Sequence, residues 1–295
     1  MTDANSTVGT LSCLSSLALI TVSVADRFTF VQCQLTIDVT KRCNELMPAG
    51  YCSPKGRLLA TPRLFQEGDT IGMIVAASNA DYLVKRLKMY VLRSKVTIER
   101  AADREVAGFV GSAPTNLGDG ALVFELPCAL PQARIAAALP SGLGLAIVPK
   151  GTACAGSEPL WWAACTAAGQ SWVFGETAER FTPHAVNLDL IGGISFNKGC
   201  YTGQEVVSRI EHIGKTNRRT VLLAANDPLE LAPGTDLTDN QGQVVATVLY
   251  GAKLADRTLL LAEVSTETAQ SEVALDTTAA TLHRLPLPYG WTRTK

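Results

Sequence analysis

The residues best suited to chemistry lie in one short stretch, residues 197–209, which reads NKGCYTGQEVVSR. Cys200 follows Lys198 by two residues and comes directly before a run that is typical of a helix start. The positive end of a helix dipole and a nearby ammonium both stabilise a thiolate relative to a thiol. The spacing therefore predicts that Cys200 is the reactive thiol of the chain. The alternative is that Cys200 only fills a small pocket at a tight turn.

The helix expected after Cys200 has signals at both ends. Thr202 is followed three residues later by Glu205, which is the spacing of a capping box. Gly214 suits the position just after a last helical turn. Between them runs an apolar seam at helical intervals, formed by Val206, Val207, Ile210 and Ile213. We expect a helix over residues 203–213, and Glu205 has an architectural alternative as part of its cap.

Other kinds of chemistry are not supported by spacing. The eight cysteines include no Cys-x-x-Cys pair and the three histidines are scattered, so the sequence predicts no metal site. No Cys-His pair can be assigned, although His184 and His212 could approach Cys200. No segment matches a phosphate-binding or dinucleotide-binding glycine loop. Nucleotide-cofactor chemistry is therefore not expected.

Composition and charge set the broader class. The chain has 295 residues, 47% hydrophobic and 18% charged, as in folded proteins of two or three domains. The apolar stretch at 11–24 has no basic residues before it and is broken by Ser and Thr, so it predicts a buried strand rather than a secretory signal. We expect a cytoplasmic protein that does not contact membranes, with reduced thiols.

Two local basic clusters stand out because the whole chain is nearly neutral, with 26 Lys and Arg against 27 Asp and Glu. Each cluster is consistent with an ordinary solvated face. The alternative is a rim that binds a phosphate backbone or a polycarboxylate. The first comprises Lys85, Arg86, Lys88, Arg93 and Lys95, and the second comprises Arg209, Lys215, Arg218 and Arg219.

The elements around these residues follow from hydrophobic periodicity. Residues 17–26 predict a strand, after which Asp26 suits the N-cap of a helix. Ser53-Pro54-Lys55-Gly56 suits a type I turn, so a hairpin is expected within residues 50–65. A strand, a helix and two more strands should follow by residue 111, as in an antiparallel sheet with helices on one face. Short β-rich runs after residue 217 predict a small barrel or sandwich.

GGISFNKGCYTGQEVVSR closely resembles the K-G-C-Y-x-G-Q-E signature of the YgfZ-type folate-binding proteins, relatives of the glycine cleavage T protein. The resemblance extends over nearly the whole chain. The other matching segments are residues 30–39, Lys55-Gly56-Arg57, residues 92–96, residues 183–188 and residues 281–289.

The resemblance implies an α+β fold in which three domains form a ring around a folate-sized hole. Residues 10–48 plus 122–215 would form a discontinuous N-terminal α+β domain that carries the KGCYTGQE motif. Residues 49–121 would form a ferredoxin-like α+β domain, and residues 216–295 a C-terminal β-barrel.

The resemblance also implies a tetrahydrofolate-type ligand. Trp162, seven residues before Gly169, matches a tryptophan that stacks near the pterin, although plain core packing is the alternative from the sequence alone. Cys200 and Lys198 would carry the chemistry. The other expected folate-binding residues are Asn187, Tyr201, Gly203, Gln204, Glu205 and Arg209.

Three positions depart from the family pattern. Leu17 stands where a second tryptophan is expected, and Cys33 stands where a glycine is usual. The hairpin strand at residues 59–62 lacks the aspartate of the aminomethyltransferases. Because that carboxylate assists transfer to folate, its absence disfavours classical aminomethyl transfer.

The resemblance therefore implies a folate-binding accessory factor more than a classical enzyme. It would support the assembly or repair of iron–sulfur enzymes, including those that thiolate tRNA, and would reach tRNA only through those partners. One alternative is a tetrahydrofolate-dependent one-carbon transferase. A second is a module that binds tRNA or protein without chemistry.

Overall fold

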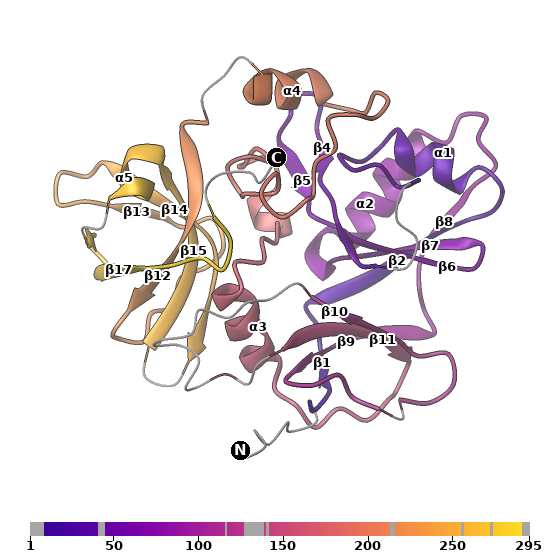
Figure 1. The fold of residues 1–295 in the computed structure, drawn as a ribbon, viewed down its shortest axis with the longest axis horizontal. Coiled ribbons are helices and arrows are strands. Elements are labelled where there is room, and N and C mark those ends of the chain that lie inside the picture. Colours follow the sequence, from indigo (N-terminus) through magenta and orange to yellow (C-terminus); the bar gives the residue numbers. More distant parts are fainter. Residues whose placement is uncertain are drawn as a thin grey trace, which may run out of the picture.

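Three antiparallel sheets form three lobes around helix α3 (Glu158–Ala167) and the loops beside it, as Figure 1 shows. The fold is α+β, as the sequence predicted. The computed structural model describes residues 9–40, 45–115, 117–126, 139, 142–212, 216–254, 257–271 and 274–290.

The first lobe is a five-stranded sheet with two helices on one face (Figure 1). Along its inner strand β2 (Leu17–Ser23), side chains alternate between two cores, as the pleat of a strand requires. Ile20 packs with helices α1 (Arg27–Gln32) and α2 (Ala77–Met89), whereas Leu17 and Leu19 join the core on the other face. The strand order is β3 (Met47–Pro48), β6 (Arg63–Glu67), β7 (Thr70–Ala76), β2 and β8 (Thr97–Arg100).

Helix α1 begins where the sequence predicted, but the side chain of Asp26 does not cap it as expected. Asp26 occupies the N-cap position without a side-chain capping bond. Its carboxylate instead accepts a hydrogen bond from the Lys95 backbone N–H at 2.6 Å, and the two backbones are also bonded at 3.1 Å. Asp26 therefore ties the start of α1 to the segment before β8.

The predicted hairpin is confirmed. Strands β4 (Tyr51–Cys52) and β5 (Leu58–Ala60) pair antiparallel. Between them the Gly56 N–H donates to the Ser53 carbonyl at 2.9 Å, which closes the predicted turn. Gly56 has a φ of +67°, a backbone angle that favours glycine. This hairpin lies beside helix α4 (Gln204–His212), the helix of the signature (Figure 1).

The second lobe is a four-stranded sheet that contacts the first through the bend between β1 and β2. Its strand β9 comes from the predicted ferredoxin-like block, yet it pairs with β11 of the predicted N-terminal domain. The division into domains stays a prediction, and this pairing shows that a sheet joins both of the blocks. The order is β1 (Ser12–Cys13), β9 (Arg104–Val110), β11 (Leu143–Pro149) and β10 (Leu122–Glu125).

One expectation about the cysteines is wrong for this lobe. Cys13 on β1 and Cys154 form a disulfide across a sequence separation of 141 residues. Among the described cysteines, Cys33, Cys52 and Cys200 are free. Spacing could not predict this pair, because strand β1 meets the loop after β11 only in the folded chain.

The third lobe is a curled six-stranded sheet, a half-barrel that agrees with the predicted C-terminal barrel (Figure 1). A short helix α5 (Thr266–Gln270) and a 3₁₀ turn η1 (Gly175–Thr177) complete the described elements. The strand order is β13 (Asp236–Thr238), β14 (Val244–Leu254), β15 (Arg257–Ser265), β12 (Arg218–Ala225), β17 (Thr281–Leu285) and β16 (Leu275–Asp276).

None of the helices in the described part of the chain has both the length and the apolar character needed to cross a membrane.

Candidate functional site

The signature turn is anchored on its first side by Lys198. The Lys198 ammonium donates to the backbone carbonyls of Gln32 at 2.5 Å, Leu35 at 2.6 Å and Ile37 at 2.8 Å. These carbonyls lie at and just beyond the end of α1, where unpaired carbonyls and the negative end of the helix dipole favour a cation. Lys198 therefore fastens the turn to α1.

Burial changes the acid–base behaviour of this lysine. Removal from water lowers the pKa of Lys198 from 10.5 to about 8, while nearby Asp38 and Cys33 act in the opposite direction. An ammonium has three donor hydrogens, and the three carbonyls account for all of them. The predicted role of Lys198 as the electrostatic partner of Cys200 is thus not supported by its hydrogen bonds.

The second anchor of the turn is Tyr201. Its ring is 7% exposed, and the Lys198 ammonium lies 5.1 Å from the ring centroid. Burial raises the pKa of Tyr201, and the nearby Cys52 on β4 raises it further. The phenol is therefore neutral at physiological pH and packs against the hairpin.

Gly203 lets the turn approach the hairpin. Its φ is +82°, and a Cβ atom there would lie 2.5 Å from the Ser53 carbonyl oxygen. Helix α4 starts one residue later, and the Val207 N–H bonds the Gly203 carbonyl at 3.3 Å. The predicted helix is confirmed over 204–212, but Gly203 holds the N-cap position that the spacing predicts for Thr202. The predicted helix end at Ile213 and Gly214 lies outside the described residues.

Cys200 lies between these two anchors and is exposed. A Cβ atom added to the neighbouring Gly199 would meet no other atom within 4 Å, so the space around the turn is open on this side. The alternative in which Cys200 fills a small pocket is therefore wrong. The signature holds a thiol at the surface on a well-anchored turn.

Cys33, which departs from the family pattern, lies at the end of α1 near Lys198, and the other predicted signature residues are on α4. Cys33 ends α1 with a φ of −83°, a right-handed conformation that requires no glycine. Gln204, Glu205 and Arg209 are on α4, where Glu205 and Arg209 are exposed.

Asn187 is fully buried, and its side chain contacts other parts of the fold. Its φ is +60°, and its side-chain amide donates to the Thr220 carbonyl on β12 at 2.8 Å. The Tyr289 hydroxyl lies 3.4 Å from the same amide nitrogen. Asn187 therefore joins the loop before the signature to the C-terminal half-barrel and to the chain end.

Trp162 on α3 is half-buried in a cluster of aromatic rings. Its indole N–H donates to the Ser16 hydroxyl at 3.0 Å. Its ring contacts Trp172, Phe174 and Tyr250, with centroid distances of 5.2 to 5.9 Å. These contacts agree with the core-packing alternative.

The predicted site residues come from separate elements of the fold. Helix α4 with the signature lies at the upper edge of the molecule in Figure 1, whereas α3 with Trp162 lies below the centre. The structure brings together Lys198, Cys200, Tyr201 and Gly203, and it places Asn187 and Trp162 in separate surroundings.

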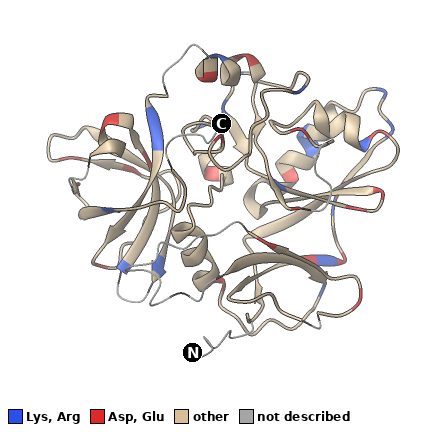
Figure 2. Ribbon diagram, in the orientation of Figure 1, with Lys and Arg blue, Asp and Glu red and all other residues tan. Residues whose placement is uncertain are grey.

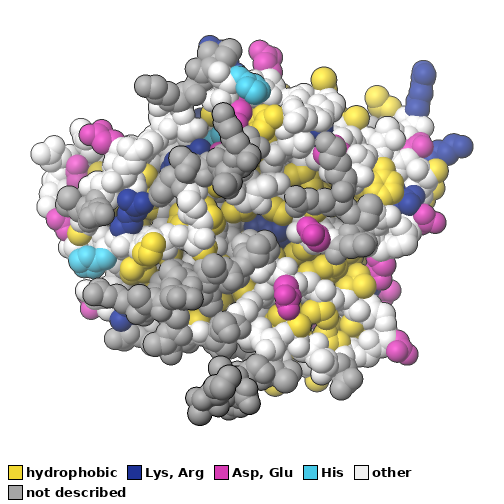
Figure 3. Space-filling view, in the orientation of Figure 1, with side chains coloured by type: hydrophobic (Ala, Val, Ile, Leu, Met, Phe, Trp, Pro, Cys, Tyr) yellow, Lys and Arg dark blue, Asp and Glu magenta, His cyan; other side chains and the backbone are white. Residues whose placement is uncertain are grey.

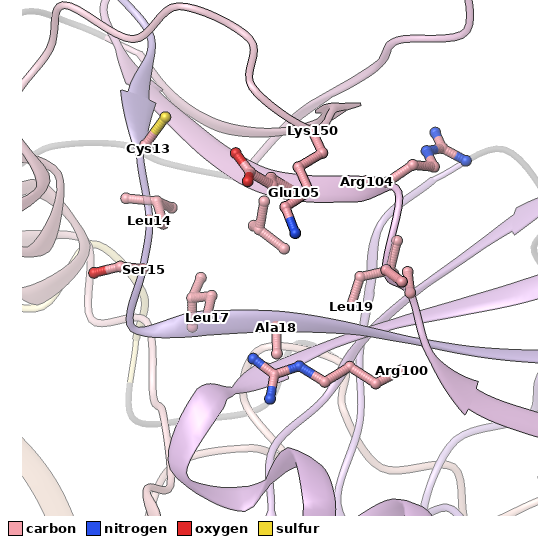
Figure 4. A pocket seen from close by; sticks show the side chains of 13 residues that line it. Cys13, Leu14, Ser15, Leu17, Ala18, Leu19, Arg100, Arg104, Glu105 and Lys150 are labelled. Atoms are coloured by element: carbon pink, nitrogen blue, oxygen red, sulfur yellow. The ribbon is translucent and has the colours of Figure 1, made fainter.

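A cavity of about 600 Å³ lies between the first two lobes (Figure 4), and neither Trp162 nor Cys200 is among its lining residues. Its apolar wall comes from the β1–β2 bend, with Leu14, Leu17 and Leu19. Figure 4 shows Lys150 reaching into the space between β2 and β9, close to Glu105. The Arg100 guanidinium lies near Ala18, while Arg104 points away. The cavity thus combines an apolar wall with a polar rim that carries more positive than negative charge.

Sequence reasoning missed a polar cluster between the signature helix and β12. His184, Asp189 and Glu211 bring ligand atoms within 4.8 Å of one another. His184 Nε2 lies 3.2 Å from a Glu211 oxygen, and burial lowers the pKa of His184. Asp189 is bound at both oxygens by Arg219, at 2.7 and 2.9 Å. Because a cation already neutralises Asp189, the cluster is better suited to joining two lobes than to holding a metal.

Comparisons with known proteins agree with this architecture. The chain is 31% identical over 307 residues to the tRNA-modifying protein YgfZ of Yersinia pestis (strain Pestoides F), covering 95% of this chain and 92% of the relative. It is 32% identical over 306 residues to the YgfZ protein of Shigella boydii serotype 4 (strain Sb227), covering 95% and 93%.

Among solved structures, the glycine cleavage system aminomethyltransferase T of Bartonella henselae matches with a TM-score of 0.69. The match covers 95% of this chain and 86% of that one, at 14% identity, and therefore shows the fold. No protein-family model matches the sequence. With the fold of the T protein, the KGCYTGQE turn and this identity over nearly its full length, the chain belongs to the YgfZ family.

Proposed function

We propose that this protein binds a tetrahydrofolate-type compound and supports the assembly or repair of iron–sulfur enzymes that modify tRNA. The names of the relatives, tRNA-modifying protein YgfZ, support the link to tRNA modification. The aminomethyltransferase fold supports folate binding, because that family acts with folate. The iron–sulfur clients follow from the family resemblance.

The observation that carries the folate proposal is the cavity between the first two lobes. Its volume of about 600 Å³ falls in the usual range for small-molecule sites. A folate has a flat ring system at one end and carboxylates at the other. The leucine wall suits the ring, and Lys150 on the rim suits a carboxylate.

Leu17 connects this cavity to the family pattern. It stands at the position where the family has a second tryptophan, and it lines the cavity. A leucine provides apolar contact without a stacking surface. We therefore expect folate to bind here more weakly than it would with a tryptophan at position 17.

The same structure argues against classical aminomethyl transfer. The hairpin strand β5 and the residues after it, 58–62, read LLATP and contain no carboxylate. The proposal is therefore an accessory factor in which Cys200 is the functional thiol and Lys198 and Tyr201 hold its turn.

Folate binding is tested by titrating tetrahydrofolate under anaerobic conditions while following tryptophan fluorescence. Lys150→Gln should raise Kd about ten-fold, because a charge-assisted contact is lost. Leu17→Trp should lower Kd by adding a stacking surface. Lys55→Gln, an exposed lysine on the hairpin turn, is the matched control. If Trp162→Ala abolishes binding while Lys150→Gln has no effect, folate binds at the aromatic cluster and the cavity is the wrong site.

The thiol role is tested separately in cells. Cys200→Ala should leave the folded protein intact, because the side chain is exposed, but should fail to restore tRNA thiolation in a strain that lacks this protein. Cys33→Ala, the other described exposed free cysteine, is the matched control. Full restoration by Cys200→Ala would remove the thiol from the mechanism.

A further inference from the structure

Helix α2 and the turn after it present an exposed band of cations and tyrosines, which we name the cationic ridge. Lys85, Lys88, Arg93 and Lys95 are on this band, and all of them are outside the protein core. Figure 2 shows Lys and Arg positions on this lobe, and Figure 3 shows dark blue side chains that project beyond the outline of the molecule at the same end. The ridge consists of Tyr82, Lys85, Lys88, Tyr90, Arg93 and Lys95.

The charge of this segment differs from that of the chain. Residues 81–95 contain five Lys and Arg and one acidic residue, Asp81, so their net charge is 5 − 1 = +4, whereas the chain has −1. Asp81 lies 3.5 Å from Arg100 on β8. Within the described residues, no carboxylate lies within 4.0 Å of the charged nitrogens of the four ridge cations. The ridge therefore has positive charge available for a partner.

The second basic cluster seen in the sequence behaves differently. Arg218 pairs with Glu263 at 2.7 Å, and Arg219 pairs with Asp189. Lys215 lies outside the described residues. Two of these cations are thus already neutralised within the fold, so among the described residues the ridge offers the larger group of unpaired cations.

The tyrosines of the ridge offer flat faces between the cations. Tyr82 is 48% exposed and Tyr90 is 39% exposed, so part of each ring is open to solvent. Arg86 lies between them: a guanidinium nitrogen is 3.4 Å from the Tyr82 hydroxyl, and its centre is 5.9 Å from the Tyr90 ring. Arg86 therefore holds the two rings in place while leaving part of each exposed.

We propose that the cationic ridge binds single-stranded RNA directly. The cations would contact phosphates, and bases would stack on Tyr82 and Tyr90, the usual combination in proteins that bind single strands. An acidic protein would use the positive charge but would gain little from exposed ring faces. The proposal goes beyond the proposed function, in which this protein reaches tRNA only through other enzymes, and it does not depend on the folate cavity.

The test is binding of a fluorescent 20-nucleotide oligouridine, followed by anisotropy between 50 and 200 mM salt. Each phosphate contact contributes about 0.7 to the slope of log affinity against log salt for a single strand. Lys85→Gln with Lys88→Gln should therefore reduce that slope by about 1.4. The matched control is Arg218→Gln with Lys253→Gln, which also removes two cations but from paired positions on the half-barrel, and it should leave the slope unchanged.

Tyr90→Ala distinguishes RNA from an acidic partner. Loss of a stacked base should weaken oligouridine binding about five-fold or more at every salt concentration. Competition by polyglutamate that equals competition by unlabelled oligouridine, with no effect of Tyr90→Ala, would overturn the proposal in favour of an acidic protein. Absence of binding at 50 mM salt, or tighter binding to a DNA duplex, would also overturn it. Lys150→Gln, which alters the folate cavity, should bind oligouridine like the wild type. The RNA proposal and the folate proposal can therefore fail independently of each other.

Discussion

At the scale of single residues, Lys198 has the largest structural role in the signature turn. Its ammonium is half-buried and satisfies three carbonyls that the end of α1 leaves unpaired. Cys200, two residues away, is exposed and makes no comparable contribution to packing. Two neighbouring residues of one motif therefore serve different purposes, one architectural and one available for reaction.

Replacing Lys198 should destabilise the protein. Lys198→Met removes the donor from three partly buried carbonyls, and each hydrogen bond to a charged group contributes about 1.5–3 kcal/mol. We expect the free energy of unfolding to fall by at least about 2 kcal/mol in urea titrations. Lys55→Met on the exposed hairpin turn should change it by less than about 0.5 kcal/mol. Equal effects of the two variants would contradict the anchoring role.

The difference in stability between the wild type and Lys198→Met should also depend on pH. The pKa of Lys198 is about 8 when folded, below its usual 10.5, so between these values the unfolded chain binds more protons. Stability rises with pH wherever the unfolded state binds more protons. The wild type should therefore gain stability relative to Lys198→Met as the pH rises from 8 to 10.5. If the wild type instead loses stability relative to Lys198→Met between pH 8 and 10.5, burial does not lower the pKa of Lys198.

At the scale of elements, the α4 helix and the β4–β5 hairpin depend on a close backbone contact. Gly203 approaches the Ser53 carbonyl because it lacks a side chain. Val206 on the first turn of α4 likewise lies against Gly56 of the hairpin. The two elements can pack this closely only because glycine occupies both contact positions.

Gly203→Ala should therefore separate the two elements. The left-handed backbone and a Cβ atom 2.5 Å from the Ser53 oxygen should together lower the free energy of unfolding by about 2 kcal/mol or more. Gly199→Ala, in the same motif but with open space around it, should change it by less than about 0.5 kcal/mol. Chemical denaturation of both variants measures the difference, and comparable losses would refute the packing argument.

The sequence predicted these elements better than it predicted their contacts. The Ser53–Gly56 turn, strand β2 and helix α4 depend on neighbouring residues, so local pattern was sufficient. The donor contacts of Lys198 involve residues more than 160 positions earlier, and no local pattern carries that information. The prediction of Thr202 as the cap is wrong because α4 begins at Gln204, which leaves Gly203, with its φ of +82°, in the position before the helix.

At the scale of the whole molecule, long-range links hold segments together both within a lobe and between lobes. The Cys13–Cys154 disulfide fixes β1 to the loop after β11. The Arg219–Asp189 ion pair and the Asn187–Thr220 hydrogen bond join the segment before the signature to the half-barrel. Local motifs could not predict these pairs, because each forms between segments that are distant in the chain.

Reducing the disulfide should lower stability measurably. A cross-link over 141 residues strongly restricts the conformations of the unfolded chain. Removing it should therefore lower the free energy of unfolding by about 2 to 5 kcal/mol. We expect a lower Tm for the wild type with a phosphine reductant. The double variant Cys13→Ser, Cys154→Ser should start from the lower Tm and be insensitive to the reductant. A wild-type Tm that does not change would show that this bond does not support the fold.

The contacts of the chain end have a consequence for synthesis. Tyr289 donates to the Gly169 carbonyl at 3.0 Å, and Leu285 and Leu287 pack on the core that includes α3. These partners are made more than one hundred residues earlier. The chain leaves the ribosome with its N-terminus first, so α3 emerges long before the side chains that cover it. This part of the core can therefore close only after residues 285–289 have been made, and a chain stopped before residue 285 leaves α3 without this cover.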